Sequence, residues 1–198
     1  CRHCYMGAPA GQSELPLATM QRILDALCAS GAMQISLTGG EPLMRADLME
    51  LIDSILARGM DVTDIFTNAT RIDDKFLAEL EARALKPLFH VSFDGVGRHD
   101  AMRGVPGAES AARRGIAALK RAGHRLILTT SVDRDTLPAL EKTYEFAKAL
   151  GVHAWGIGRP LAAGCARSMG RVEDEDFASA CHALKARWEA DGRPFTLG

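Results

Sequence analysis

The sequence predicts an α/β domain with a parallel sheet, and three observations support this fold class. Short segments rich in β-branched and aromatic residues alternate with segments whose apolar residues recur every three or four positions. The joins between these segments are short, and glycines follow several helical segments, where a left-handed residue commonly ends a helix. Strands that alternate strictly with helices are joined by right-handed crossovers, and such strands run parallel.

Helical spacing occurs in six segments, and in each the apolar residues fall on one stripe, as expected for a helix with one face on a core. The stripes are Leu17, Met20, Ile23, Leu24 and Leu27; Leu48, Leu51, Ile52 and Ile55; Phe76, Leu77 and Leu80; Ile116 and Leu119; Leu140, Tyr144 and Ala147; and Phe177, Cys181, Leu184 and Trp188. Asp73 and Thr136 are expected to cap the third and fifth helices. Four glycines are expected to end helices: Gly31, Gly59, Gly123 and Gly151.

Strands are predicted in five short segments between these helices. They cover residues 34–38, 62–67, 88–93, 125–132 and 153–157. The continuous apolar run 126–128 is typical of a strand that is buried on both faces. Periodicity alone allows either an open doubly wound sheet or a partial βα barrel. Ligands bind at the carboxyl ends of the strands in both architectures, so the strand-end sequences indicate where a site is expected.

Composition narrows the classes of protein that the chain can represent. The 198 residues are enough for one large domain, and a hydrophobic fraction of 47% is ordinary for a globular protein. A net charge of -1 without any basic run gives no reason to expect a nucleic-acid partner. No apolar run approaches the roughly 20 residues of a membrane helix, so no membrane partner is expected.

The five cysteines do not have the pattern of a secreted disulfide framework, because their number is odd and three of them are isolated. A reducing, cytoplasmic compartment is therefore expected. Cys28 and Cys181 lie on helical stripes and are predicted to be core residues, whereas Cys165 follows Gly164 in a loop.

Cys1 and Cys4 form a C-x-x-C pair that is followed by Tyr5. The pair alone is compatible with half of a zinc site, with a thioredoxin-like redox pair or with two ligands of an iron–sulfur cluster. No second C-x-x-C completes a zinc site.

A second motif, Gly39-Gly40-Glu41-Pro42, closes the first predicted strand. Glycines permit positive φ and a close approach of backbone to a ligand. The Glu41 carboxylate suits an ammonium group, and Pro42 stops the strand because it lacks an N–H donor. An ordinary βα turn is the alternative interpretation of this motif on its own.

Taken together, these motifs resemble the radical S-adenosylmethionine (SAM) superfamily, and the resemblance extends over nearly the whole chain. Cys1 and Cys4 match the second and third cysteines of the signature C-x-x-x-C-x-Φ-C. The other matching segments are 39–42 (GGEP), 67–70 (like T-N-G-T), 92–95 (like S-L-D-G), 99–104 (like H-D-x-x-R-G) and 159–161 with Gly164 (like the sixth-strand segment). The S-x-D-G and H-D-x-x-R-G pair is typical of the branch of peptide and sulfatase maturases, many of which carry a SPASM extension.

The resemblance implies a partial (β/α)6 barrel of the radical SAM type over residues 1–198. The N-terminal strand and first cluster cysteine are expected upstream of Cys1, and a C-terminal extension is expected downstream. It also implies two cofactors, a [4Fe–4S] cluster with Cys1 and Cys4 as ligands, and SAM. The implied SAM-binding residues are His3, Tyr5, Gly39, Gly40, Glu41, Pro42, Asn68, Ser92, Asp94 and Arg103.

The activity implied is reductive cleavage of SAM to a 5′-deoxyadenosyl radical that modifies a peptide or protein, with a reductant such as flavodoxin or ferredoxin. In this scheme Glu41 suits the SAM ammonium, Ser92 and Arg103 suit its carboxylate, and His3 lies near the adenine. Asp94 either faces the ligand or forms the turn before Gly95. Ala69 replaces the family's glycine, which puts the turn at 67–70 in doubt. A non-catalytic βα module without a cluster is the alternative.

Overall fold

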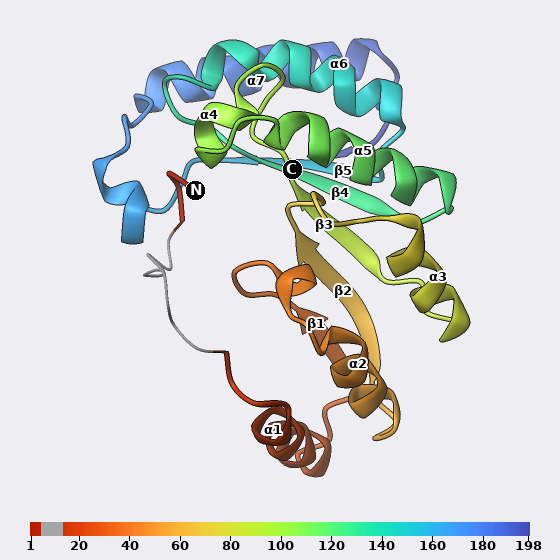
Figure 1. Ribbon diagram of the computed structural model, residues 1–198. Helices are drawn as coiled ribbons and strands as arrows, with labels where there is room; N and C mark the ends of the chain where they lie inside the picture. The colour runs from red at the N-terminus through yellow and green to blue at the C-terminus, as the bar shows by residue number, and fades with distance from the viewer. Residues whose placement is uncertain (5–13) are drawn as a thin grey trace.

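The computed structural model describes residues 1–4 and 14–198, and its centre is a six-stranded sheet in the order β1-β2-β3-β4-β5-β6 (Figure 1). The strands are β1 (Gln34–Leu37), β2 (Asp61–Thr67), β3 (Leu88–Ser92), β4 (Leu126–Ser131), β5 (Ala154–Gly158) and β6 (Thr196–Leu197). All five pairings are parallel. The predicted α/β class and parallel sheet are confirmed, and the five predicted strands lie where expected. The short strand β6 was not predicted.

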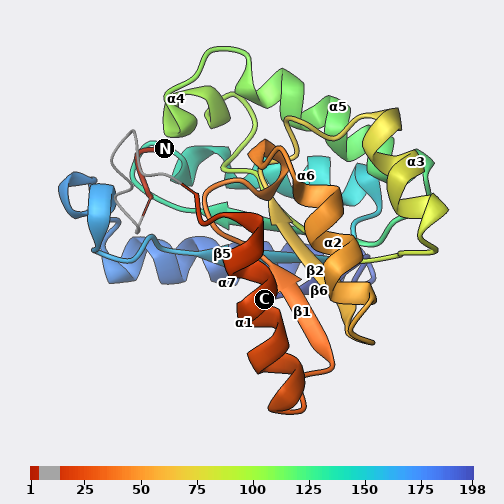
Figure 2. The ribbon, with the colours of Figure 1, turned by 60° about the horizontal axis from the view of Figure 1, so that its bottom comes forward.

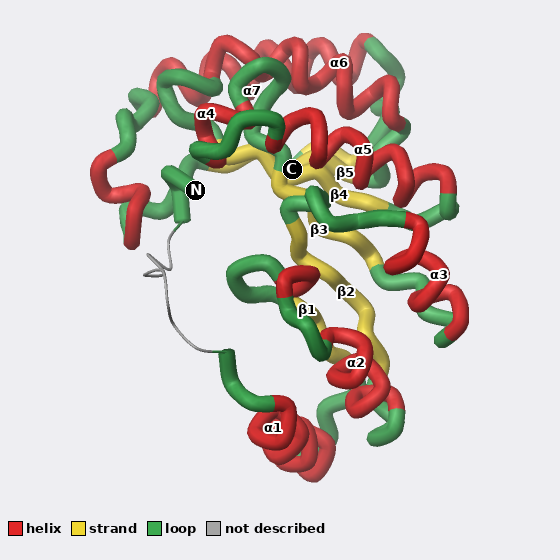
Figure 3. Tube along the Cα trace, in the orientation of Figure 1, coloured by secondary structure: helices red, strands yellow, loops and turns green. Residues whose placement is uncertain are grey.

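The helices alternate with the strands, as the sequence pattern predicts (Figure 3). They are α1 (Leu17–Ala29), α2 (Leu48–Leu56), α3 (Asp74–Ala82), α4 (His99–Arg103), α5 (Ala108–Arg121), α6 (Leu140–Leu150) and α7 (Asp174–Ala190). Three 3₁₀ turns, η1 (Pro42–Met44), η2 (Leu137–Ala139) and η3 (Gly164–Ser168), follow β1, β4 and β5. Helices α2, α3, α5 and α6 lie along the outer side of the curved sheet in Figures 1 and 2. Of the helices in the described ranges, none combines the length and apolar character needed to cross a bilayer.

The two faces of the sheet differ in polarity. Apolar strand residues on the helix side are fully buried: Ile65, Phe89, Val91, Leu128 and Trp155. The opposite face carries Ser36, Asp64, Phe66, His90 and Thr129, all exposed or half-buried. Period-two alternation explains this division, because successive side chains of a strand point to opposite faces. The sheet is therefore a part-barrel with an apolar outer face under the helices and a polar inner face.

The helix ends agree in part with the sequence prediction. Oδ1 of Asp73 accepts a hydrogen bond from the main-chain N of Phe76 at 2.8 Å, so Asp73 caps α3 as predicted. The four predicted glycines all have a left-handed backbone. The prediction for Thr136 was wrong: it precedes η2 rather than α6, and its hydroxyl is used by Asp133, whose N–H donates to it at 2.8 Å.

The prediction that Cys28 is a core residue was also wrong. Cys28 is exposed, because α1 lies at the edge of the sheet and buries only Leu24. Cys181 is half-buried in α7, and burial raises the pKa of its thiol.

Candidate functional site

The segment that carries Cys1 and Cys4 is docked beside α4, at the edge of the sheet where the strands end (Figure 1). The N–H of Arg2 donates to the main-chain oxygen of Met102 at 3.0 Å, and the N–H of Cys4 donates to the oxygen of Cys1 at 3.3 Å. Nη1 of Arg103 lies 3.6 Å from Sγ of Cys1. A guanidinium beside a thiol favours the thiolate, which is the form that binds metal.

The other side of the same segment contacts η3. The N–H of Cys165 donates to the main-chain oxygen of Cys4 at 2.9 Å. The loop after β5 and the cysteine motif are therefore neighbours, although more than half of the chain separates them. Cys165 is exposed in this position.

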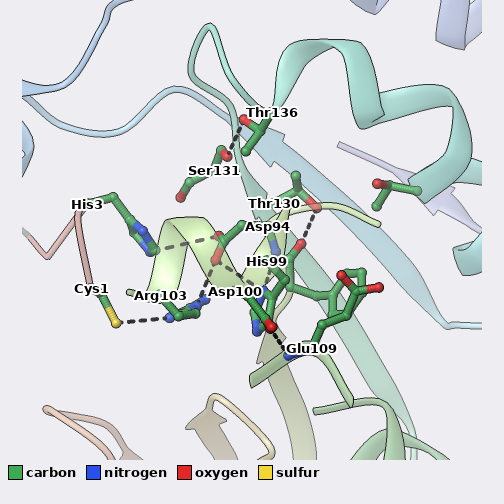
Figure 4. Close-up of polar contacts among 12 residues, drawn as sticks. Cys1, His3, Asp94, His99, Asp100, Arg103, Glu109, Thr130, Ser131 and Thr136 are labelled. Atoms are coloured by element: carbon green, nitrogen blue, oxygen red, sulfur yellow. Dashed lines mark hydrogen bonds and ion pairs between the residues drawn. The ribbon is translucent and has the colours of Figure 1, made fainter. Parts of the chain in front are cut away.

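A buried aspartate organises the centre of the site (Figure 4). Asp94, at the end of β3, is 1% exposed, and Nε of Arg103 lies 2.7 Å from its Oδ2. Nε2 of His3 lies 3.9 Å from Oδ1 of Asp94. His99, fully buried and stacked on Phe93 at 4.9 Å, accepts the main-chain N–H of Asp94 at Nδ1. Residues from β3, α4 and the cysteine segment thus meet at one carboxylate.

The electrostatics of the site follow from this arrangement. Burial alone would raise the pKa of Asp94, yet its pKa lies below the ordinary value because His99, Arg103 and His3 surround the carboxylate. Since Nδ1 of His99 accepts an N–H, it holds no proton for the carboxylate, and we assign the lowering chiefly to the Arg103 charge. Burial lowers the pKa of His3, although Asp94 opposes this effect.

Several polar atoms in this cluster are buried without a well-directed hydrogen bond. They are Oδ1 of Asp94, Nη2 of Arg103, Nδ1 of His3 and Nε2 of His99, whereas Oδ2 of Asp94 and Nε of Arg103 are partners in the 2.7 Å ion pair. Each such atom costs about 1–3 kcal/mol when it has no partner. A concentration of unsatisfied donors and acceptors of this kind suits a polar, charged ligand that supplies the missing bonds.

The glycine–glutamate motif lies at the end of β1, and its carboxylate ties it to the end of β2. Oε1 of Glu41 accepts from Oγ1 of Thr67 at 2.7 Å and from N of Leu43 at 3.2 Å. Oε2 accepts from N of Asn68 at 2.7 Å. Each carboxylate oxygen has two acceptor positions, so one position on Oε2 remains for a ligand donor. Gly39 has φ of 135°, a conformation that residues with side chains rarely adopt.

The turn after β2 has a left-handed backbone at Ala69, where the resembling family motif has glycine. Ala69 has φ of 59° and is fully buried. Oδ1 of Asn68 accepts from N and Oγ1 of Thr70 at 2.9 and 2.6 Å. A β-carbon on Gly115 in α5 would lie 1.9 Å from the Ala69 oxygen, so only glycine at that helix position allows the turn to pack this closely.

A cavity of about 240 Å³ links the two halves of the site. Its walls include Asn68 and Thr70 from the β2 end and His99 and Arg103 from α4. Asn68, whose N–H donates to Glu41, and Arg103, which pairs with Asp94, therefore line the same cavity.

The predicted site residues fall into two groups around this cavity. Cys1, Cys4, His3, Asp94 and Arg103 form one group, and Glu41 and Asn68 form the other. Gly39, Gly40 and Pro42 are part of the turn that carries Glu41. Ser92 is half-buried at the end of β3, opposite Thr129. Tyr5 lies outside the described residues.

His99 is a central residue that the sequence patterns did not single out as a ligand contact. The H-D-x-x-R-G segment was the available signal, and its two polar residues have different positions. His99 is buried against Asp94, whereas Asp100 fixes the loop before α5 by accepting from the N–H groups of Gly107 and Glu109 at 2.7 and 2.6 Å.

The residues present fit the two expected cofactors. Within residues 1–4 and 14–198, no group of three or more histidine, cysteine or acidic side chains is placed to hold one metal ion. Cys1 and Cys4 nevertheless share one turn, and the Cys1 thiol lies beside Arg103 of α4, which suits two thiolates on a common cluster. The unsatisfied cluster around Asp94 and the remaining acceptor on Glu41 suit a zwitterionic ligand such as SAM.

A parallel part-barrel with a thiol pair and a charged cavity at its strand ends defines a cofactor-binding βα-barrel domain. The comparisons with known proteins specify the class further. The sequence profile of the radical SAM superfamily matches residues 1–147, and the chain belongs to that superfamily.

Two curated relatives illustrate its range. The chain is 33% identical over 174 residues to the AdoMet-dependent heme synthase of Oleidesulfovibrio alaskensis, covering 86% of this chain and 44% of the relative. It is 30% identical over 171 residues to the PqqA peptide cyclase of Granulibacter bethesdensis, covering 79% of this chain and 45% of the relative. The chain thus spans about half the length of these curated relatives.

The fold is also that of a solved structure, Streptococcus suis SuiB bound to S-adenosylmethionine, with a TM-score of 0.81 at 14% identity. The similarity covers 100% of this chain and 46% of SuiB.

Proposed function

We propose that the whole protein is a radical SAM enzyme. The observation that carries this proposal is the buried Asp94–Arg103 ion pair beside the Cys1 thiol, in which Oδ1 of Asp94 and Nη2 of Arg103 make no hydrogen bond. When bound, a [4Fe–4S] cluster and SAM supply a 5′-deoxyadenosyl radical by reductive cleavage of a carbon–sulfur bond. The protein then has to hold SAM in one orientation and keep water away from it.

Each part of the site has a proposed role in holding the cofactors. Cys1 and Cys4 bind the cluster with a third thiolate from upstream sequence. Arg103 and Ser92 bind the SAM carboxylate, since a guanidinium can form two parallel bonds to it. Glu41 accepts from the SAM ammonium at the position that remains on Oε2. His3 lies near the adenine, and Asp94 orients Arg103.

A peptide or protein is the first candidate substrate. One relative is named a peptide cyclase, and the SuiB fold is also known bound to its precursor peptide SuiA. The enzyme would then work in the cytoplasm with a flavodoxin- or ferredoxin-type reductant.

An iron tetrapyrrole is the second candidate, and a specific observation favours it. The heme synthase relative is 33% identical over 86% of this chain, whereas the peptide cyclase is 30% identical over 79% of this chain. Both candidates would begin with the same reductive cleavage of SAM and would differ in the substrate that the radical meets.

The test is anaerobic reconstitution of the full-length protein with iron and sulfide, followed by reduction and measurement of 5′-deoxyadenosine. We expect SAM cleavage by the wild type and its loss in Cys1→Ala. Cys28→Ala is the matched control, because Cys28 is exposed on α1, far from the site, and its loss should leave cleavage unchanged. A folded wild-type protein that assembles no cluster and yields no 5′-deoxyadenosine would instead support the non-catalytic βα module.

A further inference from the structure

A second cavity, of about 530 Å³, lies at the carboxyl ends of β4 and β5, apart from the one that Asn68 and Arg103 share. Its floor is formed by buried Val132, Ala166 and Val172. Its walls combine apolar side chains with the cations of Arg159, Arg167 and Arg171. The volume lies in the ordinary range for small-molecule sites, and the lining is both apolar and basic.

The positive charge of this cavity is not neutralised by its own residues. Arg159 and Arg171 both pair with the single carboxylate of Asp174, at the start of α7. Within the described part of the chain, the Arg167 guanidinium has no hydrogen bond or ion pair. The three arginine cations of the cavity are therefore balanced by one carboxylate, which two of them share.

Among the described residues that line the cavity one is acidic, and it is already engaged within the chain. Asp133 is 2% exposed, and its Oδ1 accepts from N of Asp135 at 3.0 Å and from N and Oγ1 of Thr136 at 2.9 and 3.0 Å. It stabilises the loop after β4 and does not turn its charge toward the arginines. The cavity therefore remains electropositive.

The cavity lies close to the cysteine motif. Ala166 and Arg167, which line it, belong to the same turn η3 as Cys165, whose N–H donates to the Cys4 oxygen at 2.9 Å. In Figure 1 this loop and the N-terminus lie together at the left. A molecule seated in the cavity would therefore extend toward the cofactors from the β4–β5 side.

We propose that this arginine cavity binds carboxylates on the rim of an apolar ring, as in a tetrapyrrole with propionate side chains. Each arginine would donate two parallel hydrogen bonds to a carboxylate, while Pro160, Leu161 and Met169 contact the ring edge. The inference rests on the tetrapyrrole candidate of the proposed function. It places the carboxylates of that tetrapyrrole in the cavity at the ends of β4 and β5. An acidic peptide offers the same charge but no rigid apolar edge to fill the cavity.

The test measures binding of metal-free coproporphyrin III to the full-length protein by equilibrium dialysis, which requires no catalysis. Single changes Arg159→Gln, Arg167→Gln and Arg171→Gln should each weaken binding roughly tenfold, which is the effect of losing about 1.4 kcal/mol of a charge-assisted contact. Asp174→Asn should tighten binding, because it releases two arginines from their internal partner. A residue with a merely structural role would not produce this gain.

The matched control is Arg114→Gln, since Arg114 is exposed on α5 and, among the described residues, its side chain bonds to Ser110 alone. It should leave the affinity unchanged. Equal affinity for the tetramethyl ester of coproporphyrin III would overturn the proposal, as would arginine variants that bind normally, or a folded Asp174→Asn variant that fails to bind more tightly. Binding of an alternating glutamate–leucine peptide in place of the porphyrin would also overturn it.

Failure of this proposal is distinguishable from failure of the proposed function. Formation of 5′-deoxyadenosine without substrate depends on Cys1 and Asp94, and the arginine variants should leave it intact. If the enzyme cleaves SAM but does not bind the porphyrin, only the proposed carboxylate site is refuted.

Discussion

Nε of Arg103 lies 2.7 Å from Oδ2 of Asp94, with the aspartate 1% and the arginine side chain 11% exposed. The pair joins the end of β3 to α4, and it also aims Nη1 of Arg103 at the Cys1 thiol. A buried ion pair of this kind is costly unless further hydrogen bonds satisfy it, and these bonds are lacking on both carboxylate oxygens. The pair therefore resembles a preorganised ligand contact more than a source of stability.

The first prediction concerns Asp94. Changing Asp94→Asn removes the charge that holds Arg103 in place and should weaken SAM binding to the reconstituted full-length protein roughly tenfold. Isothermal titration with SAM measures the change. Asp100→Asn, which alters only the loop before α5, is the neighbouring control. Unaltered SAM affinity in Asp94→Asn would show that Arg103 needs no orientation by this carboxylate.

The second prediction concerns Glu41, whose carboxylate has both structural partners and a position for a ligand. Glu41→Gln keeps one oxygen, which can still accept from Thr67 and Leu43, but it sets an NH2 group against the Asn68 N–H and loses the charge, so the fold should survive while SAM binding weakens. Glu41→Ala also leaves those donors unsatisfied, which should lower the free energy of unfolding by about 1–3 kcal/mol. Urea unfolding and SAM titration of the two variants separate the two effects. A Gln variant that binds SAM normally would remove Glu41 from the ligand site.

The sequence predicted the strands well because each is a short apolar run buried against the helices, as with Leu126 and Leu128. It did not predict β6 or α4, since two and five residues are too few to establish a period. Cys28 shows a different limit. A helical stripe indicates which face is apolar, but not how much of the sheet is there to cover it, and α1 lies at the edge.

The sequence also predicted only part of the site. The motifs pointed to Cys1, Glu41 and Arg103, because these residues match the family patterns. They did not reveal that Asp94 pairs with Arg103 or that Cys4 contacts the Cys165 turn, since these contacts join distant parts of the chain. The arginine cavity likewise depends on how η3 folds back over β4.

The third prediction concerns the close approach of α5 to the turn after β2. Gly115→Ala would place a β-carbon 1.9 Å from the Ala69 oxygen, so the helix or the turn must move. Overpacking of this kind costs about 1–3 kcal/mol, and the free energy of unfolding should fall by that amount. Ser110→Ala, on the exposed side of the same helix, should change it by less than about 0.5 kcal/mol. Chemical denaturation of both variants decides the point, and equal stability would refute the close contact.

The fourth prediction concerns pH. Hydrogen bonds from Lys148 and Tyr144 lower the pKa of Asp191 to about 2, whereas burial, followed by the hydrogen bond to Asp191, raises the pKa of Tyr144 to about 12. A depressed carboxyl pKa contributes stability above its unfolded value, near 3.8, and loses it as the pH falls toward 2. A raised tyrosine pKa contributes stability below about 10 and loses it as the pH rises toward 12.

Asp191→Asn should therefore remove the loss of stability that Asp191 causes on the acid side and reduce the loss on the alkaline side in part, because burial still raises the pKa of Tyr144. Urea midpoints measured across the pH range, in wild type and variant, provide the comparison. Asp174→Asn is a suitable control for the alkaline side, because Asp174 pairs with arginines that keep their charge throughout. Identical pH profiles for wild type and Asp191→Asn would contradict the assignment of this coupling.

The last prediction concerns cluster binding by residues 1–198 alone. Cys1 and Cys4 supply two thiolates, and a [4Fe–4S] cluster that binds SAM needs three, so this chain should not hold a stable cluster or cleave SAM. Cys165 is the nearest further thiol, since its turn is bonded to Cys4. Anaerobic reconstitution should give brown colour and reductive formation of 5′-deoxyadenosine in the full-length protein but not in this chain, with iron and sulfide measured in both. A chain that binds a full cluster, and loses it in Cys165→Ser, would show that Cys165 serves as the third ligand.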